Sequence, residues 1–224
     1  MKKEIVVSGT RPTGHIHIGN YFGAIANFVR MQEDYPNNYF FIADLHSLTT
    51  HPFSNELPIN VKRVLSIYLA CGLNPDKSVI YVQSDLPQIS ELYLILNMFA
   101  YKGELEKVPT FKEKLRTPGQ TINAGLLTYP VLMAADILIH RAAKVPVGKD
   151  QEPHLEMARN FAQRFNLLAN QVVFPEPQAF SYKSELLKVP SLDGSGKMSK
   201  SHDNPDAAIY LTDSDEMIIK KIKR

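Results

Sequence analysis

Short apolar runs alternate with longer amphipathic segments over the first two thirds of the chain. Four strands are predicted from the apolar runs at residues 4–8, 39–43, 79–82 and 145–147. Helices are predicted where apolar residues recur at helical spacing: from Asn20 to before Pro36, and over 56–70, 89–101, 124–141 and 152–166. A charged segment, Phe111–Lys114, separates the third and fourth of these helices. Strands that alternate with helices predict an α/β fold, a Rossmann-like parallel sheet with helices on both faces.

The pattern changes toward the C-terminus. Prolines recur and periodicity fades between residues 167 and 192, and a further helix is predicted from about Asp213 to the end. We therefore expect one α/β domain over residues 1–190, with a helical insertion over about 89–141, and the start of a helical C-terminal domain over 191–224. The basic run Lys220–Arg224 is interpreted as the solvated face of that last helix. Whether 224 residues is the natural length or a fragment stays open.

Composition narrows the class of protein. Hydrophobic residues are 44% and charged residues 21%, as in ordinary globular domains, and a net charge of +2 does not by itself indicate a nucleic-acid partner. Cys71 is the only cysteine, which excludes an intramolecular disulfide and a cysteine-rich metal site, so we expect no protein-bound metal. Pro130 and Asp136 interrupt the best candidate for the ~20 apolar residues of a membrane helix. We expect a cytoplasmic protein with no membrane partner.

A glycine-rich loop follows the first predicted strand. Gly9, Gly14 and Gly19 are spaced so that the backbone can approach a ligand, at the position where an open parallel sheet places its crevice. The helix that starts at Asn20 offers free N–H groups to phosphate, and His17 could add a donor. The alternative is a plain turn with Asn20 as the helix cap. A metal site is disfavoured because the loop holds no cysteine or carboxylate.

A second constellation, Lys197-Met-Ser-Lys-Ser201, lies some 180 residues later, after Gly194 and Gly196. Two lysines three residues apart, beside two hydroxyls, are typical of a loop that closes over a polyphosphate and neutralises the charge that develops there. The alternative is an exposed basic loop without a ligand.

Together the two constellations resemble a known family. Pro12-x-x-x-x-His17-Ile-Gly-Asn20 resembles the first signature of class I aminoacyl-tRNA synthetases, with Asn in place of the final His, and Lys197–Ser201 matches their second signature. This resemblance implies a synthetase whose substrate complex is ATP with Mg²⁺ and which has no prosthetic group. It also places the catalytic centre in the α/β domain of residues 1–190.

The amino-acid substrate is predicted from a carboxylate on an apolar helix. Tyr129, Met133 and Asp136 share one helical face, and a buried acid is costly unless a donor reaches it. A structural salt bridge, for example to Arg141, is the alternative that helical spacing alone favours. However, Thr128–Leu138 resembles the tryptophan-site helix of bacterial tryptophanyl-tRNA synthetases. The resemblance implies that Asp136 binds the indole N–H, with Tyr129 and Met133 lining the pocket.

The resemblance covers essentially the whole chain and implies the remaining roles. The catalytic residues would be His17, Lys114, Lys197 and Lys200. ATP would contact Arg11, Pro12, Thr13, Gly19, Asn20, Gly148, Lys149, Asp150, Val189, Lys197, Met198, Ser199, Lys200 and Ser201. Tryptophan would contact Val7, His46, Tyr129, Met133, Asp136 and Gln151.

Three positions depart from the family pattern. Val7 stands where many relatives carry an aromatic residue, Arg11 where some carry glutamine, and Lys149 where an acid is frequent. The implied partners are L-tryptophan, ATP and tRNA(Trp), in a homodimer with contacts near residues 89–101. The rival interpretations are a tyrosyl-tRNA synthetase and a truncated, non-catalytic nucleotide-binding relative. A dinucleotide-binding dehydrogenase is disfavoured because the glycine spacing is not G-x-G-x-x-G.

Overall fold

A computed structural model describes residues 4–50, 55–116, 122–148, 151–180, 189–198 and 204–223. Its core is one sheet of five parallel strands in the order β3-β2-β1-β4-β5. The strands are β1 (Ile5–Thr10), β2 (Asn37–Ile42), β3 (Val79–Val82), β4 (Lys144–Pro146) and β5 (Gln178–Phe180). The four predicted strands are confirmed. The fifth pairs with β4 and was not predicted, because three residues in a proline-containing segment show no periodicity.

Helices connect the strands and complete the chain. They are α1 (Ile18–Asn20), the π-helical turn η1 (Tyr21–Ile25), α2 (Ala26–Asp34), α3 (Asp44–Leu48), α4 (Leu57–Ala70), the 3₁₀ turn η2 (Gln83–Asp85), α5 (Pro87–Asn97), α6 (Lys102–Leu105), α7 (Pro109–Arg116), α8 (Ala124–Leu138), α9 (Glu152–Leu168), the 3₁₀ turn η4 (Pro205–Ala207) and α10 (Asp215–Ile222). Helix α7 occupies the charged segment that was expected only to separate two helices. Helix α8 ends before residue 141 because Arg141 takes the left-handed conformation, with φ of 53°.

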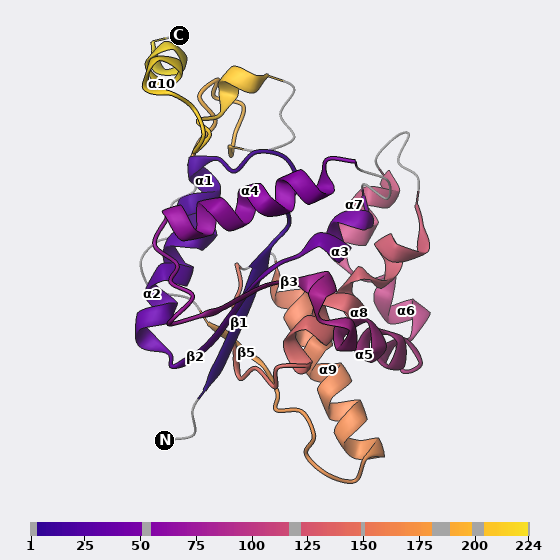
Figure 1. Ribbon diagram of the computed structural model, residues 1–224. Coiled ribbons are helices and arrows are strands. Elements are labelled where there is room, and N and C mark those ends of the chain that lie inside the picture. Colours follow the sequence, from indigo (N-terminus) through magenta and orange to yellow (C-terminus); the bar gives the residue numbers. More distant parts are fainter. Residues whose placement is uncertain are drawn as a thin grey trace.

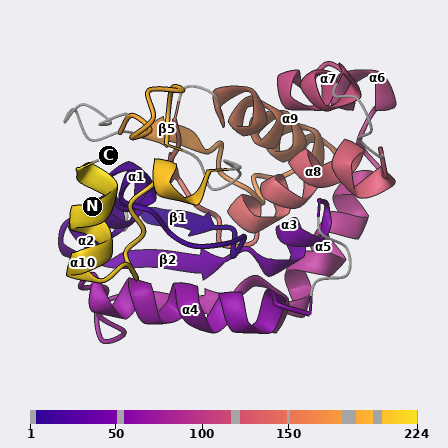
Figure 2. The ribbon, with the colours of Figure 1, turned by 90° about the horizontal axis from the view of Figure 1, so that it is seen from above.

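The sheet separates two apolar cores. Alternate residues of β1 point to opposite faces, so Val6 packs with α2 and α4, whereas Val7 packs with α5, α8 and α9. Figures 1 and 2 show these two helical layers on either side of the strands. The predicted covering of both faces is therefore confirmed. No helix among the described residues is long and apolar enough to cross a bilayer.

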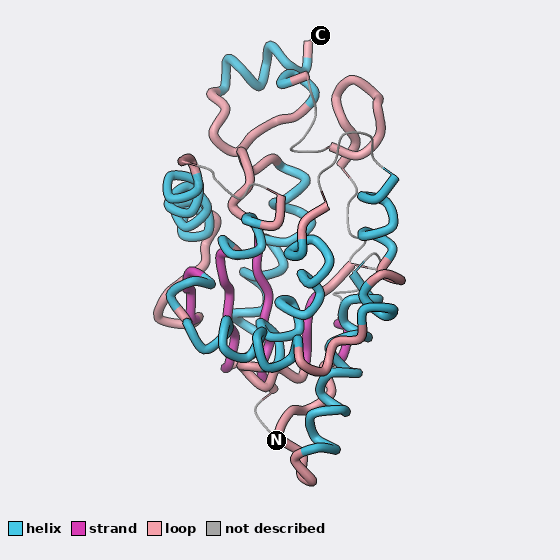
Figure 3. The backbone as a smooth tube through the Cα atoms, turned by 90° about the vertical axis from the view of Figure 1, so that its right-hand side faces the viewer, coloured by secondary structure: helices cyan, strands magenta, loops and turns pink. Residues whose placement is uncertain are grey.

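The last described segment, residues 204–223, lies against the loop that follows β1. The backbone N–H of Ile18 donates to Ile209 (3.0 Å), and that of Leu211 donates to Ile16 (2.9 Å). Figures 1 and 3 show this segment at the end of the molecule opposite the N-terminus. Lys221 is buried here and pairs with Asp213 (2.6 Å). The interpretation of Lys220–Arg224 as a solvated face is wrong at Lys221, because its ammonium group is buried and donates to Asp213 and to the carbonyl oxygen of Ala208.

The order of strands creates a crevice between β1 and β4. The chain leaves β1 toward β2 on one side and leaves β4 toward β5 on the other, so the loops after these neighbouring strands diverge. Ligands of open α/β sheets bind at the carboxyl ends of strands at such a switch point. The fold therefore predicts a site after Thr10 and after Pro146.

Candidate active site

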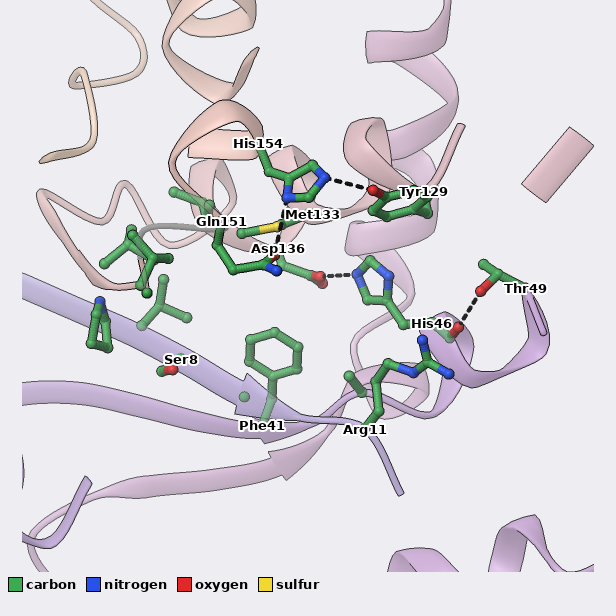
Figure 4. Close-up of a pocket in the computed structure, with 18 of the residues that line it drawn as sticks. Ser8, Arg11, Phe41, His46, Thr49, Tyr129, Met133, Asp136, Gln151 and His154 are labelled. Atoms are coloured by element: carbon green, nitrogen blue, oxygen red, sulfur yellow. Dashed lines mark hydrogen bonds and ion pairs between the residues drawn. The ribbon is translucent and has the colours of Figure 1, made fainter. Parts of the chain in front are cut away.

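A cavity of about 400 Å³ lies at this switch point. Its walls come from the ends of β1 and β4 and from helices α3, α7, α8 and α9, and Figure 4 shows the side chains converging on it. Gly9 allows Phe41 of the neighbouring strand to approach closely at one wall, because a Cβ there would lie 2.7 Å from the carbonyl oxygen of Phe41. A cavity of this size, largely apolar and open at one side, suits an amino acid with a large side chain.

Asp136 is the most deeply buried charge of this cavity. Helix α8 buries most of its residues, and Asp136 is 1% exposed. Its Oδ1 accepts a hydrogen bond from Nε2 of Gln83 (2.7 Å), and its Oδ2 lies 2.8 Å from Nε2 of His46. Burial raises the pKa of the Asp136 carboxyl, whereas the hydrogen bonds from His46 and Gln83 act in the opposite direction.

Asp136 forms no ion pair with an arginine or lysine among the described residues. Its ion-pair partner among the described residues is His46, and Arg141 is not among its hydrogen-bond partners there. The alternative of a salt bridge to a neighbouring segment therefore does not hold for Arg141, and the ion-pair partner is instead the imidazole of His46 on α3. Each carboxylate oxygen can accept two hydrogen bonds and has one partner among the described residues. The carboxylate of Asp136, which lines the cavity, therefore has capacity to accept a further hydrogen bond.

A second polar cluster lines the same cavity as Asp136. The hydroxyl of Tyr129 lies 2.5 Å from Nε2 of His154, and Nδ1 of His154 lies 3.0 Å from Oε1 of Gln151. The Gln151 carbonyl oxygen only accepts, so Nδ1 carries the imidazole proton, and in the neutral ring Nε2 accepts from the tyrosine. The buried imidazole thus orients one group from α8 and one from the start of α9.

Sequence reasoning missed two members of these clusters. His154 lies three residues after Gln151 and shares its face of α9, a spacing that could have found it. Gln83 directly follows β3, and a polar residue at the carboxyl end of a parallel strand is the signal that could have found it. Both are buried.

The glycine-rich loop and the lysine signature meet near Gly19. A Cβ on Gly19 would lie 2.9 Å from Nδ1 of His17 and 3.7 Å from Cβ of Val189. Val189 in turn accepts a hydrogen bond from the backbone N–H of Met198 (3.0 Å). Two segments separated by some 170 residues therefore lie side by side.

The helix begins at Ile18, two residues earlier than predicted, so its N-cap is His17 and the prediction of Asn20 as the N-cap is wrong. Asn20 is the third residue of the helix, and its side chain caps the turn from inside. The backbone N–H of His17 donates to Oδ1 of Asn20 (3.2 Å), and His17 is 2% exposed. The cap and a ligand role are compatible, because the cap uses only one oxygen of the amide. The π-helical turn η1 follows immediately, and such turns are frequent at functional sites.

Comparison with known proteins identifies the family. A family model for class I tRNA synthetases (W and Y) matches residues 1–224. The chain belongs to this family.

Relatives within the family share much of the sequence. A tryptophan–tRNA ligase of Porphyromonas gingivalis is 60% identical over 221 residues, and the match covers 99% of this chain and 66% of the relative. A tryptophan–tRNA ligase of Borreliella burgdorferi is 45% identical over 226 residues, with 99% and 63% covered. This chain therefore spans just under two thirds of the length of these relatives.

Solved structures agree in fold. Tryptophanyl-tRNA synthetase of Campylobacter jejuni, complexed with ADP and tryptophan, superposes with a TM-score of 0.87 at 39% identity, covering 97% of this chain and 66% of that one. Tyrosyl-tRNA synthetase of Archaeoglobus fulgidus, complexed with L-tyrosine, has a TM-score of 0.78 at 18% identity, covering 100% and 66%. The second likeness is one of fold alone.

The site residues predicted from the family resemblance fall into three groups: those that line the large cavity, those that are described but do not line it, and those outside the described residues. Those that line the cavity are Val7, Arg11, His46, Lys114, Tyr129, Met133, Asp136, Gly148 and Gln151. Those that are described but do not line it are Pro12, Thr13, His17, Gly19, Asn20, Val189, Lys197 and Met198. Lys149, Asp150, Ser199, Lys200 and Ser201 lie outside the described residues.

A smaller cavity of about 140 Å³ continues the crevice toward η1. It shares Gly9 and Gly148 with the large cavity and is closed by Gly23 and Asn27. The crevice therefore has one compartment lined by Asp136 and another lined by residues of β1, η1 and α2.

Proposed function

We propose that the chain activates L-tryptophan with ATP and that the complete reaction transfers tryptophan to tRNA(Trp). The observation that carries the proposal is Asp136, a buried acceptor aimed at a largely apolar cavity of amino-acid size. The indole ring combines a large apolar surface with a single N–H donor, which matches that cavity. The relatives that match at 60% and 45% identity are tryptophan–tRNA ligases.

The nucleotide would occupy the end of the crevice near Gly9, Gly148 and η1. The C. jejuni relative, which is complexed with ADP and tryptophan, supports binding of a nucleotide as well as tryptophan. Arg11 and Lys114 line the opening of the large cavity, where they would face phosphate. Lys197 is exposed at the base of the turn formed by Gly194 and Gly196, which have φ of 73° and 125°.

The chemistry would be attack by the tryptophan carboxylate on the α-phosphorus of ATP. The nucleophile is already ionised at neutral pH, so no enzyme base and no covalent enzyme intermediate are needed. The bond between the carboxylate oxygen and the α-phosphorus forms as the bond between the α-phosphorus and the pyrophosphate oxygen breaks, giving tryptophanyl-adenylate and pyrophosphate. ATP would enter as its Mg²⁺ complex, and the chain would contribute alignment of the reactants and cationic neutralisation of pyrophosphate by Lys197 and Lys200.

Transfer would follow at the 2′-hydroxyl of the terminal adenosine of the tRNA.

We also propose that this cytoplasmic enzyme is a homodimer that uses α5. Leu94, Ile95 and Met98 expose apolar side chains on this helix, and Met98 is 71% exposed. A row of this kind is costly in water unless another surface covers it. Sedimentation at two concentrations, with Met98→Glu as the comparison, tests the dimer.

Pyrophosphate exchange into ATP tests the activation step. The 224-residue chain is assayed with tryptophan, with tyrosine and without an amino acid. Exchange that depends on tryptophan supports the proposal, and exchange that depends on tyrosine supports a tyrosyl-tRNA synthetase. If the chain binds the nucleotide but shows no exchange with either amino acid, the result supports a non-catalytic relative.

A further inference from the structure

Gln83 connects three segments around the large cavity without lining it. It is the first residue of η2, directly after β3, and it is 0% exposed. Its Nε2 donates to Oδ1 of Asp136 on α8 (2.7 Å), and its Oε1 accepts from the backbone N–H of His46 at the start of α3 (3.3 Å). His46 itself contacts the other oxygen of Asp136. Gln83 therefore holds both the acid and the imidazole beside it.

The amide of Gln83 has a property that its partners lack. An amide nitrogen donates at every pH of interest, so Oδ1 of Asp136 is always presented with a donor. A protonated Asp136 would carry an O–H of its own and would lose acceptor capacity. Burial pushes the pKa of Asp136 upward, and the hydrogen bond from Gln83 opposes that shift. The tautomer of His46 can change, whereas the donor of Gln83 cannot.

We infer that Gln83 is a positioning residue for indole recognition, because its amide keeps Asp136 an oriented hydrogen-bond acceptor toward the cavity. The inference rests on the proposed function. Gln83 acts through Asp136 and touches no substrate. Its contribution is to selectivity for a ligand that carries an N–H, and it differs from the contribution of a buried glutamine that only supports the fold.

A ligand that lacks the N–H separates these two roles. The probe is L-3-(benzothien-3-yl)alanine, in which sulfur replaces the indole N–H with little change in shape. Selectivity is the ratio of the dissociation constants of this analogue and of tryptophan, measured by calorimetry with the 224-residue chain. The chain contains no tryptophan, so the fluorescence of bound tryptophan provides a second readout.

Two variants of Gln83 and one control carry the experiment. Gln83→Leu removes the donor, and Gln83→Glu keeps the shape but replaces the amide by a carboxyl. The control is Gln32→Leu, because Gln32 is also buried and hydrogen-bonded, to Gly72 and Asn74, and also does not line the large cavity, but is not among the hydrogen-bond partners of Asp136 in the described part of the chain. Thermal melts compare the stability of the three variants.

Gln83→Leu is expected to lower selectivity about 10-fold or more, because a lost hydrogen bond to a charged group leaves Asp136 less firmly an acceptor. Gln32→Leu is expected to lower the melting temperature and to keep the selectivity of the unaltered chain. Equal selectivity in Gln83→Leu and the unaltered chain overturns the inference while the proposed function stands. A failure of the unaltered chain to bind tryptophan overturns both.

Gln83→Glu adds a pH signature. Two carboxyls at this distance share a proton, and the protonated glutamate donates to Asp136 as the amide does. Other titratable groups around Asp136 are His46 and Asp44 from α3, Tyr81 from β3, Tyr129 on α8 and His154 on α9, and all are present in both proteins. Selectivity of the variant relative to the unaltered chain should therefore fall as pH rises, by up to about tenfold per unit once the shared proton is lost. A ratio that does not change with pH overturns the inference.

Discussion

The two ends of the crevice are built in opposite ways. At the amino-acid end, Asp136, Gln83 and His154 are buried and held by hydrogen bonds between regular elements. At the nucleotide end, Arg11 and Lys197 are exposed and come from the loop after β1 and from a glycine turn. In the proposed function, the helices would present acceptors to tryptophan, and the loops would present cations to ATP.

This difference follows from what each end must do. Discrimination between amino acids needs desolvated groups, because a buried polar group left without its partner penalises the wrong ligand heavily. Neutralising a phosphate that every reaction shares needs charge but little discrimination, and exposed cations cost little to keep in water before the ligand arrives. Substitutions at the two ends should therefore separate selectivity from rate.

The largest effect is expected from Asp136→Ala. Loss of the acceptor should lower tryptophan selectivity and kcat/KM by about 10³-fold or more, because the indole N–H would be buried without a partner. The KM for ATP should change much less. Pyrophosphate exchange at varied tryptophan and varied ATP measures both.

Leu132→Ala is the matched control for that substitution. Leu132 is buried on the same helix but does not line the cavity, so its removal weakens core packing alone. Unchanged tryptophan affinity in Asp136→Ala would remove the assignment of the pocket.

Lys197→Ala should give the next largest effect, and of the opposite kind. Loss of a cation that neutralises pyrophosphate should slow adenylate formation by about 10²–10³-fold, with tryptophan affinity nearly unchanged. Single-turnover kinetics measure the rate, and calorimetry measures the affinity. Lys62→Ala, an exposed lysine of α4, is the control. An unaltered rate in Lys197→Ala would exclude this lysine from the reaction.

Tyr129→Phe should have a smaller effect at the amino-acid end. The phenol oxygen bridges the cavity and His154, and its removal should weaken tryptophan binding about 10-fold. Tyr93→Phe is matched to it, because Tyr93 bonds to Thr128 on the same helix (2.7 Å) but does not line the cavity. Equal binding by the two variants would show that the Tyr129 hydroxyl has no part in the site.

Much of the fold could be predicted from periodicity, and its gaps have physical reasons. The central strands are buried on both faces and read as continuous apolar runs, whereas β5 and α3 are held mainly by tertiary contacts that leave no period in three to five residues. Helix α7 was missed because Lys112 and Lys114 dominate its composition, although Phe111 anchors it in the core.

The site divides in the same way. Asp136 could be predicted because a charge on an apolar helix stands out, and its neighbours Tyr129 and Met133 follow from helical spacing. For Gln83 the sequence offers only its position directly after a predicted strand, and that position does not show which group its amide contacts. Only the packing of η2 against α8 shows that its amide meets the acid.

The smallest effect is expected in the dependence of stability on pH, and it arises from His140, which does not line the large cavity. Burial lowers the pKa of His140 to about 4, and its ring stacks on Tyr39 and lies 2.7 Å from the hydroxyl of Tyr81. Because this pKa is below the unfolded value of about 6.5, the unfolded chain binds more protons between the two values. Stability should therefore be complete above about pH 6.5 and should fall as pH drops toward 4. His140→Phe should make the melting temperature fall clearly less over that range, whereas His15→Phe, at an exposed ring, should not. Parallel melting profiles for His140→Phe and the unaltered chain would show that the acid sensitivity has its origin elsewhere.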